Sequence, residues 1–303
     1  MISTARWRDG VKFALLATGH YRRSLARARF PGVAVLCYHG VRPDDLPDGA
    51  MAFEALHVRA SELDAHCRVL ASTCHPITLA EWRASLAGGP PLPPRPVLVT
   101  FDDGYRTIAT VARPILERHR IPALLFVCAT PIERRTAFLH DAIARRSGEA
   151  AAESFKSAPY AMWRDALDDH SSPVPPDDPH AVLSVDELRM LARRGFEIGS
   201  HTSTHAALLQ APPQEQWHEI ARNHAALDAW LGAPPAAFAY PFGQPTDYSS
   251  ETQRILRDHG FEFAFTTTAG FAVGHPGLEC PRFVMLSGIT AAELAHRLTY
   301  SWH

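Results

Sequence analysis

Long apolar runs, paired cysteines and a strong net charge are all missing from this 303-residue sequence. No stretch comes near the roughly 20 consecutive apolar residues of a membrane-spanning helix. The five cysteines show no close-paired spacing, which indicates free thiols in a reducing compartment rather than a disulfide framework. The net charge of −2 argues against a nucleic-acid-binding protein. With 46% apolar and 20% charged residues, the composition is that of an ordinary globular protein.

The first 30 residues differ from the rest because they contain seven cations against a single acid, Asp9. Their apolar segment, 13–17, is too short for the core of a signal peptide, so we expect a cytoplasmic protein. We expect a basic helical extension over residues 1–30. It either packs on the domain with a solvated basic face, which we favour, or makes peripheral contact with an anionic membrane.

The remainder alternates between short apolar segments and helical patterns, which is typical of parallel strands with outer helices. Capping boxes at 78–81, 184–187 and 290–293 mark the starts of three helices. We therefore predict an α/β fold, an irregular (β/α)7-type barrel formed as a single domain by residues 31–303. Its expected strands lie near 33–38, 96–99, 123–128, 196–199, 237–241, 261–267 and 282–285.

Residues 131–182 interrupt this alternation with a polar, alanine-rich segment that ends in prolines, serines and aspartates. We expect an insertion with one or two helices and a loose end. Connections this long are usually functional or disordered. The insertion is either a lid over a site or a passive addition, and the sequence favours the second.

Two adjacent carboxylates, Asp102 and Asp103, follow the apolar run 96–99 and precede Gly104. Neighbouring residues of a strand point to opposite faces, so the two side chains stay together only if the backbone bends, which Gly104 permits. One such carboxylate can bind a cation while the other accepts a proton. An ordinary Asp-Asp-Gly turn is the competing interpretation.

A pair of histidines, His201 and His205, follows another predicted strand. Two imidazoles four residues apart can reach one ion from a helical turn or from a tight loop. Because the chain has 17 histidines, the pair alone is weak evidence. Combined with an aspartate from the other strand end, it gives a mixed nitrogen and oxygen ligand set that leaves coordination positions open.

These segments resemble the polysaccharide deacetylases, also called the NodB-homology family or carbohydrate esterase family 4. The run 100–104 reads Thr-Phe-Asp-Asp-Gly and the run 201–205 reads His-Thr-Ser-Thr-His, as in the first two motifs of that family. The run 239–243, Ala-Tyr-Pro-Phe-Gly, is similar to its third motif, which usually begins with arginine. The resemblance covers roughly residues 33–286 without the insertion.

The resemblance implies a metal-dependent hydrolase that removes N-acetyl groups from an amino-sugar-containing polysaccharide or glycan. It implies that Asp103, His201 and His205 bind a divalent ion, expected to be zinc, with cobalt and nickel as suitable alternatives. Asp102 would then be the general base, which the neighbouring cation keeps ionised. The backbone N–H of Phe242 would face the oxyanion. Sugar or acyl contacts are expected at Tyr105, Tyr240, Pro241 and Phe242.

Two departures from the family pattern leave positions unassigned. Ala239 stands where many members place an arginine that orients the catalytic aspartate, so another group must hold Asp102. No histidine occupies the late motif that usually supplies the general acid. Instead, His39 ends the first predicted strand in a Tyr-His-x-Val segment. This segment resembles the branch of poly-N-acetylglucosamine deacetylases, where the motif order is permuted, and it assigns His39 as the acid; a structural histidine is the alternative.

Other classes of function compete with this interpretation. A deformylase or amidase that acts on a lipid-linked amino sugar or a small amide would use the same ligands. A non-catalytic glycan-binding homologue would need no base, so Asp102 argues against it. The sequence has no Gly-x-Ser-x-Gly elbow for a serine hydrolase and too few clustered carboxylates for a two-metal phosphoesterase.

Overall fold

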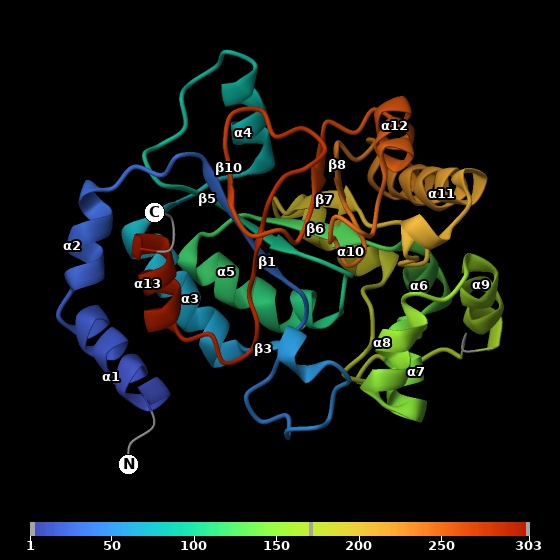
Figure 1. The fold of residues 1–303 in the computed structure, drawn as a ribbon, viewed down its shortest axis with the longest axis horizontal. Helices are drawn as coiled ribbons and strands as arrows, with labels where there is room; N and C mark the ends of the chain where they lie inside the picture. The colour runs from blue at the N-terminus through green and yellow to red at the C-terminus, as the bar shows by residue number, and fades with distance from the viewer. Residues whose placement is uncertain (1–3, 170–171, 301–303) are drawn as a thin grey trace.

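Parallel strands form the centre of the molecule in a computed structural model, which describes residues 4–169 and 172–300 (Figure 1). The sheet keeps chain order, with each strand parallel to the next. Its strands are β1 (Val33–Tyr38), β5 (Pro96–Phe101), β6 (Ala123–Val127), β7 (Glu197–Ser200), β8 (Ala237–Ala239) and β9 (Phe263–Phe265). Strands β1, β5 and β6 are buried at every residue, as expected where both faces of a parallel sheet are covered.

The two ends of this curled sheet are joined by the segment 280–285. Cys280 pairs with Phe265 of β9 in a parallel bridge, and β11 (Phe283–Val284) then pairs in parallel with β1. A short antiparallel strand, β10 (Phe271–Ala272), also borders β1. The expected irregular barrel is therefore confirmed, and the last strand does close against the first.

Alternation along the strands separates two sets of side chains. One row of β1 contains Val33, Val35 and Cys37, and the matching row of β5 contains Leu98 and Thr100. Val33, Val35 and Leu98 belong to one apolar cluster with Phe126 and Phe265, and Trp82 covers it. The opposite row packs against helices in a second and larger cluster. Cys37 and the end of β5 therefore belong to the same row of side chains.

Helices surround the sheet in the predicted places. The capping box at Thr78 starts α4 (Leu79–Leu86), and that at Ser184 starts α10 (Val185–Arg193). The helix between β5 and β6 consists of a π-helical segment, Ile108–Ala112, followed by α5 (Arg113–His119). The other helices of the barrel are α3 (Ala60–Thr73), α11 (Pro213–Leu231), α12 (Ser250–Asp258) and α13 (Ala291–Tyr300). Besides β10, the short strands absent from the prediction are β2 (Val41–Arg42), β3 (Val58–Arg59) and β4 (His75–Pro76).

The N-terminal segment forms two helices, α1 (Thr4–Ala17) and α2 (His20–Arg27), which pack beside α13 (Figure 1). Lys12 pairs with Glu293 of α13, and the Tyr21 hydroxyl lies 3.1 Å from Nδ1 of His296. Within the described residues, no helix has the length and apolar character needed to cross a membrane.

The insertion is more ordered than the sequence indicated. Four helices follow β6: α6 (Ala129–Arg134), α7 (Leu139–Ser147), α8 (Glu149–Phe155) and α9 (Tyr160–Asp169). The expectation of one or two helices is wrong, because α7, α8 and α9 share a core that includes Leu139, Ile143, Ala152 and Trp163. Helix α6 instead packs its Ile132 in the larger cluster of the barrel. The four helices lie together at one end of the sheet (Figure 1).

Candidate active site

The chain bends at the end of β5 and turns both aspartates toward the barrel mouth. Asp103 has a φ of 73° and Gly104 a φ of 91°, both in the left-handed region that side chains rarely adopt. A Cβ added to Gly104 would lie 2.9 Å from Cγ1 of Val127, so the turn also needs glycine for space. Asp102 N–H donates to the Tyr38 carbonyl at 2.9 Å and joins this turn to β1.

Asp103 meets both histidines of the second motif. Its Oδ1 lies 3.4 Å from Nε2 of His201 and 3.3 Å from Nε2 of His205. The histidines come from a tight loop after β7 rather than from a helix, with left-handed backbone at Thr202 and His205. Glu219 of α11 holds this loop by accepting the Thr204 N–H at 2.9 Å and its hydroxyl at 2.8 Å.

These three side chains fit a divalent ion. Bonds of about 2.0–2.1 Å to a tetrahedral ion place neighbouring nitrogen and oxygen ligands about 3.3–3.4 Å apart, as found here. Asp103 Oδ1 is buried without a hydrogen-bond partner in the described part of the chain. His201 directs its other nitrogen, Nδ1, to the Ala239 carbonyl at 2.7 Å, which is how metal-binding imidazoles are usually oriented. Burial would raise the pKa of Asp103, but the facing imidazoles hold this pKa well below its usual value.

Arg282 holds the neighbouring carboxylate, Asp102. Its Nη1 and Nη2 donate to Oδ1 and Oδ2 of Asp102, each at 2.7 Å, and both side chains are buried. Arg282 Nε donates to the Thr266 carbonyl at 2.9 Å, which fixes the guanidinium. Burial raises the pKa of Asp102, but Arg282 and the nearby His201 outweigh it and lower this pKa overall. Arg282 thus orients Asp102 in place of the arginine that many family members have at the position of Ala239.

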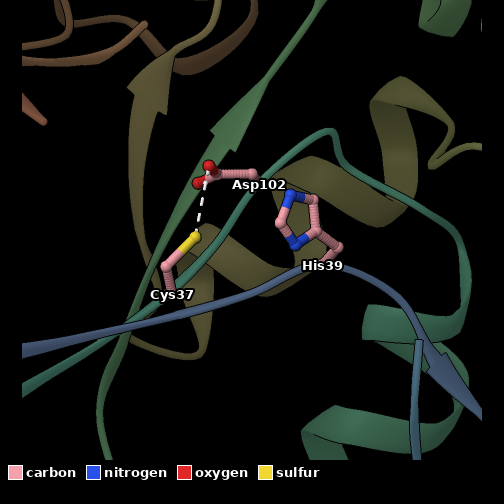
Figure 2. A group of neighbouring side chains, drawn as sticks. All are labelled: Cys37, His39 and Asp102. Atoms are coloured by element: carbon pink, nitrogen blue, oxygen red, sulfur yellow. Dashed lines mark hydrogen bonds between the residues drawn. The ribbon is translucent and has the colours of Figure 1, made fainter. Parts of the chain in front are cut away.

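Cys37 of β1 and His39, the second residue after Cys37, lie beside Asp102 (Figure 2). The Cys37 thiol donates to Oδ2 of Asp102 at 3.4 Å. His39, just beyond the end of β1, is half-buried and faces the same carboxylate, and its Nδ1 is buried without a hydrogen-bond partner among the described residues. The histidine proposed as the acid therefore lies beside the aspartate proposed as the base.

The third motif forms the wall opposite β1. Phe242 has a φ of 62°, and its backbone N–H makes no hydrogen bond within the described part of the chain. Tyr240 also lines the cavity, but its ring stacks on Tyr248 with 4.0 Å between centroids and its hydroxyl donates to the Leu278 carbonyl. Pro241 is buried in the turn and does not line the cavity.

Tyr105 is not among the side chains that line the cavity, and its expected contact with substrate stays a prediction. Its side chain is 1% exposed and its ring packs against His57 and Phe138. Its hydroxyl donates to Asp141 of the insertion at 2.8 Å. The residue lies near the strand end, but the insertion covers it.

A cavity of about 300 Å³ connects these groups, at the lower end of the usual range for small-molecule sites. The insertion lines part of it with His140, Glu153 and Lys156, and Phe53 adds a wall from the loop before β3. The Lys156 ammonium lies 4.7 Å from the centre of the Phe242 ring. At the other end of α8, the Phe53 N–H donates to Glu149 at 2.7 Å. Helix α8 thus contacts both sides of the cavity.

Comparisons with known proteins agree with this architecture. The solved structure of the Streptococcus pyogenes deacetylase PplD in complex with acetate aligns with a TM-score of 0.66 at 20% identity, over 88% of this chain and 98% of that one. IcaB from Ammonifex degensii aligns with a TM-score of 0.65 at 24% identity, over 90% of this chain and 99% of that one. These likenesses show a shared barrel fold.

The sequence model of the polysaccharide deacetylase family matches residues 89–264, more than half of the chain. Poly-beta-1,6-N-acetyl-D-glucosamine N-deacetylase of Escherichia coli (strain K12) is 29% identical over 281 residues, which cover 88% of this chain but 38% of that protein. YxkH of Bacillus subtilis (strain 168) is 23% identical over 80% of this chain and 67% of its own length. The chain belongs to the polysaccharide deacetylase family and is a hydrolase of carbon–nitrogen bonds other than peptide bonds.

Proposed function

We propose that this protein removes N-acetyl groups from an amino-sugar glycan, with Asp103, His201 and His205 as the ligands of a divalent ion, Asp102 as the base and His39 as the acid. One observation carries the proposal. Three ligand atoms lie at the mutual distances of a metal site, and beside them is a carboxylate that is fixed but free of the ligand set. A pure binding protein has no use for the second carboxylate.

A divalent cation at these ligands, zinc by the mixture of donors, would polarise the amide carbonyl and lower the pKa of a water molecule in the cavity. Asp102 is ready to accept the proton of the attacking water because Arg282 keeps it ionised and fixes its orientation. The Phe242 N–H, which has no other partner among the described residues, supports the charge that develops on the acyl oxygen.

The amine that leaves must be protonated, because an amide anion is a very poor leaving group. His39 faces the cavity next to Asp102 and can donate this proton to the sugar nitrogen. The products are acetate and a free amino sugar. The position of His39 just beyond the end of β1 supports the permuted arrangement expected from the Tyr-His-x-Val segment.

The walls of the cavity suit a sugar ring. Phe53 and Phe242 offer apolar faces, while Gln244 and Thr267 add polar groups beside them. The chain spans only 38% of the length of the Escherichia coli relative. The substrate class of that relative, an N-acetylated amino-sugar glycan, is therefore part of the proposal for this chain and not a finding about it.

The test is product analysis with the purified chain and acetylated glucosamine oligomers, with N-formyl analogues assayed in parallel. We expect release of acetate, its loss after treatment with a chelator and its recovery with zinc or cobalt. Asp102→Asn should keep the bound metal but lower turnover by about 10²–10⁴-fold, as removal of a general base does. Full activity in the metal-free protein would exclude the proposal, and formate release alone would reassign the acyl group.

A further inference from the structure

A second set of metal-ligating atoms lies beside the first. Besides Asp103, His201 and His205, the described residues hold one other group with a mixed donor set, and it consists of Cys37, His39 and Asp102 (Figure 2). Their sulfur, nitrogen and oxygen atoms all lie within 4.8 Å of one another. This group contains the chain's proposed acid and base, and it adds a thiol that the proposed reaction does not use.

The thiol and the carboxylate are already at the spacing of two zinc ligands. Bonds of about 2.3 Å to sulfur and about 2.0 Å to oxygen, at the tetrahedral angle, place the two ligand atoms about 3.5 Å apart. The observed distance from Cys37 Sγ to Asp102 Oδ2 is 3.4 Å. An ion that replaces the thiol proton between these atoms would therefore need little movement of either side chain.

His39 supplies the third ligand and the route of access. It lines the cavity together with Asp102, whereas Cys37 lies behind the carboxylate and is fully buried. Nδ1 of His39 is buried with no hydrogen-bond partner among the described residues, so an ion bound through this nitrogen would not have to displace an existing bond.

The charges limit which ions can bind. Arg282 already contacts both oxygens of Asp102, so an additional cation is tolerated only if it brings in new negative charge. Deprotonation of Cys37 supplies that charge, and a thiolate prefers soft or borderline ions such as zinc and cadmium over magnesium or manganese.

We propose that Cys37, His39 and Asp102 form a second, inhibitory site for thiophilic divalent ions. The inhibition, but not the binding, rests on the proposed function, because the ion would occupy both the base and the acid. The ion at Asp103, His201 and His205 then activates the protein, while excess zinc or cadmium at the second site switches it off.

The experiment titrates the metal-free 303-residue chain with cadmium and follows both bound metal and the ultraviolet absorption of the cadmium–thiolate bond. The wild type should bind two equivalents, and the thiolate absorption should accompany one of them. Cys37→Ser should bind one equivalent without this absorption. Mutation of residues that only hydrogen-bond to metal ligands lowers metal affinity by about 10–100-fold. Loss of Cys37, a direct ligand, should weaken cadmium binding at the second site at least as much.

Matched variants separate this thiol from the others. Cys128→Ser and Cys280→Ser, both at buried cysteines, should keep the absorption. His205→Gln, which removes a ligand of the first site, should keep it as well. His39→Gln should move it to cadmium concentrations at least ten-fold higher, and this variant tests the site even if Cys37→Ser does not fold.

Activity provides the second measurement. Excess zinc should inhibit the wild type at least ten-fold more strongly than Cys37→Ser. A single equivalent of cadmium in the wild type, or thiolate absorption that persists in Cys37→Ser, would overturn the site. Two equivalents with the thiolate absorption in a protein without deacetylase activity would leave the site standing and reject the proposed function alone.

Discussion

At the residue scale, the site depends on one buried ion pair. Asp102 and Arg282 are 180 positions apart and each is almost fully buried. The sequence showed that the usual arginine is replaced by Ala239, but it did not show what compensates. An arginine inside the predicted strand 282–285 was the available signal, because a buried guanidinium needs a carboxylate partner. Which carboxylate it meets depends on barrel closure, which local pattern cannot give.

Arg282→Gln should therefore damage the base in two ways. Without the guanidinium, Asp102 loses the largest influence that opposes burial and its pKa rises, so the acid limb of the kcat/KM profile should move to higher pH. Looser positioning should lower kcat by about 10²-fold. A pH–rate profile from pH 4 to 9 measures both, and Arg254→Gln, at an exposed pair on α12, is the control for loss of a cation. An unshifted acid limb would remove Arg282 from this role.

His39→Gln tests the acid through the leaving group. General acid catalysis contributes about 10²–10⁴-fold, and kcat for an acetylated amino sugar should fall by that amount while bound metal stays unchanged. An aryl acetate with a good leaving group needs no such proton, so its hydrolysis should change less than three-fold, roughly the scatter of single substitutions. Equal losses on both substrates would return His39 to a structural role.

At the scale of elements, strand ends were predictable and the insertion was not. Short apolar runs placed Asp102, Asp103, His201 and His205 after parallel strands, whose carboxyl ends meet at one rim. The insertion reaches the cavity through contacts between distant positions, from Glu149 to Phe53 and from Lys156 to Phe242. Its helices are short and alanine-rich, so their packing rather than their sequence pattern determines where they lie. The structure thus favours the interpretation as a cover over the cavity.

Lys156→Met should measure what this cover contributes. Loss of the ammonium over Phe242 removes an interaction worth about 0.5–1 kcal/mol at exposed sites, so KM for the glycan should rise about 2–5-fold. The kcat and the metal content should stay within two-fold, close to experimental scatter for such changes. Lys12→Met is a matched control because Lys12 is the other lysine of the chain and pairs with Glu293 on α13. A KM equal to that of the control would make the contact incidental.

At the scale of the whole molecule, the barrel buries several neutral histidines. Burial lowers the pKa of four histidines: His57, His66, His140 and His180. His57 is fully enclosed, and its pKa is lowered to about 3. Neither ring nitrogen of His57 has a hydrogen-bond partner in the described part of the chain. In the unfolded chain these groups titrate near pH 6.5. The number of histidines can be counted in the sequence, but their burial arises from packing between distant parts of the chain.

Stability should accordingly decrease in mild acid. Below pH 6.5 His57 becomes protonated in the unfolded chain, whereas in the folded protein it stays neutral until the pH approaches its pKa of about 3. The free energy of unfolding therefore falls as the pH falls from 6.5 toward 3. For His57 alone, the loss between pH 7 and pH 5 is about 2 kcal/mol, a large part of the usual 5–15 kcal/mol. Urea unfolding at pH 7, 6 and 5 measures it. His57→Leu, which gives up no hydrogen bond, should reduce the loss by that amount, whereas His218→Leu, on the surface helix α11, should not. An equal decrease in all three proteins would place the acid sensitivity in other groups.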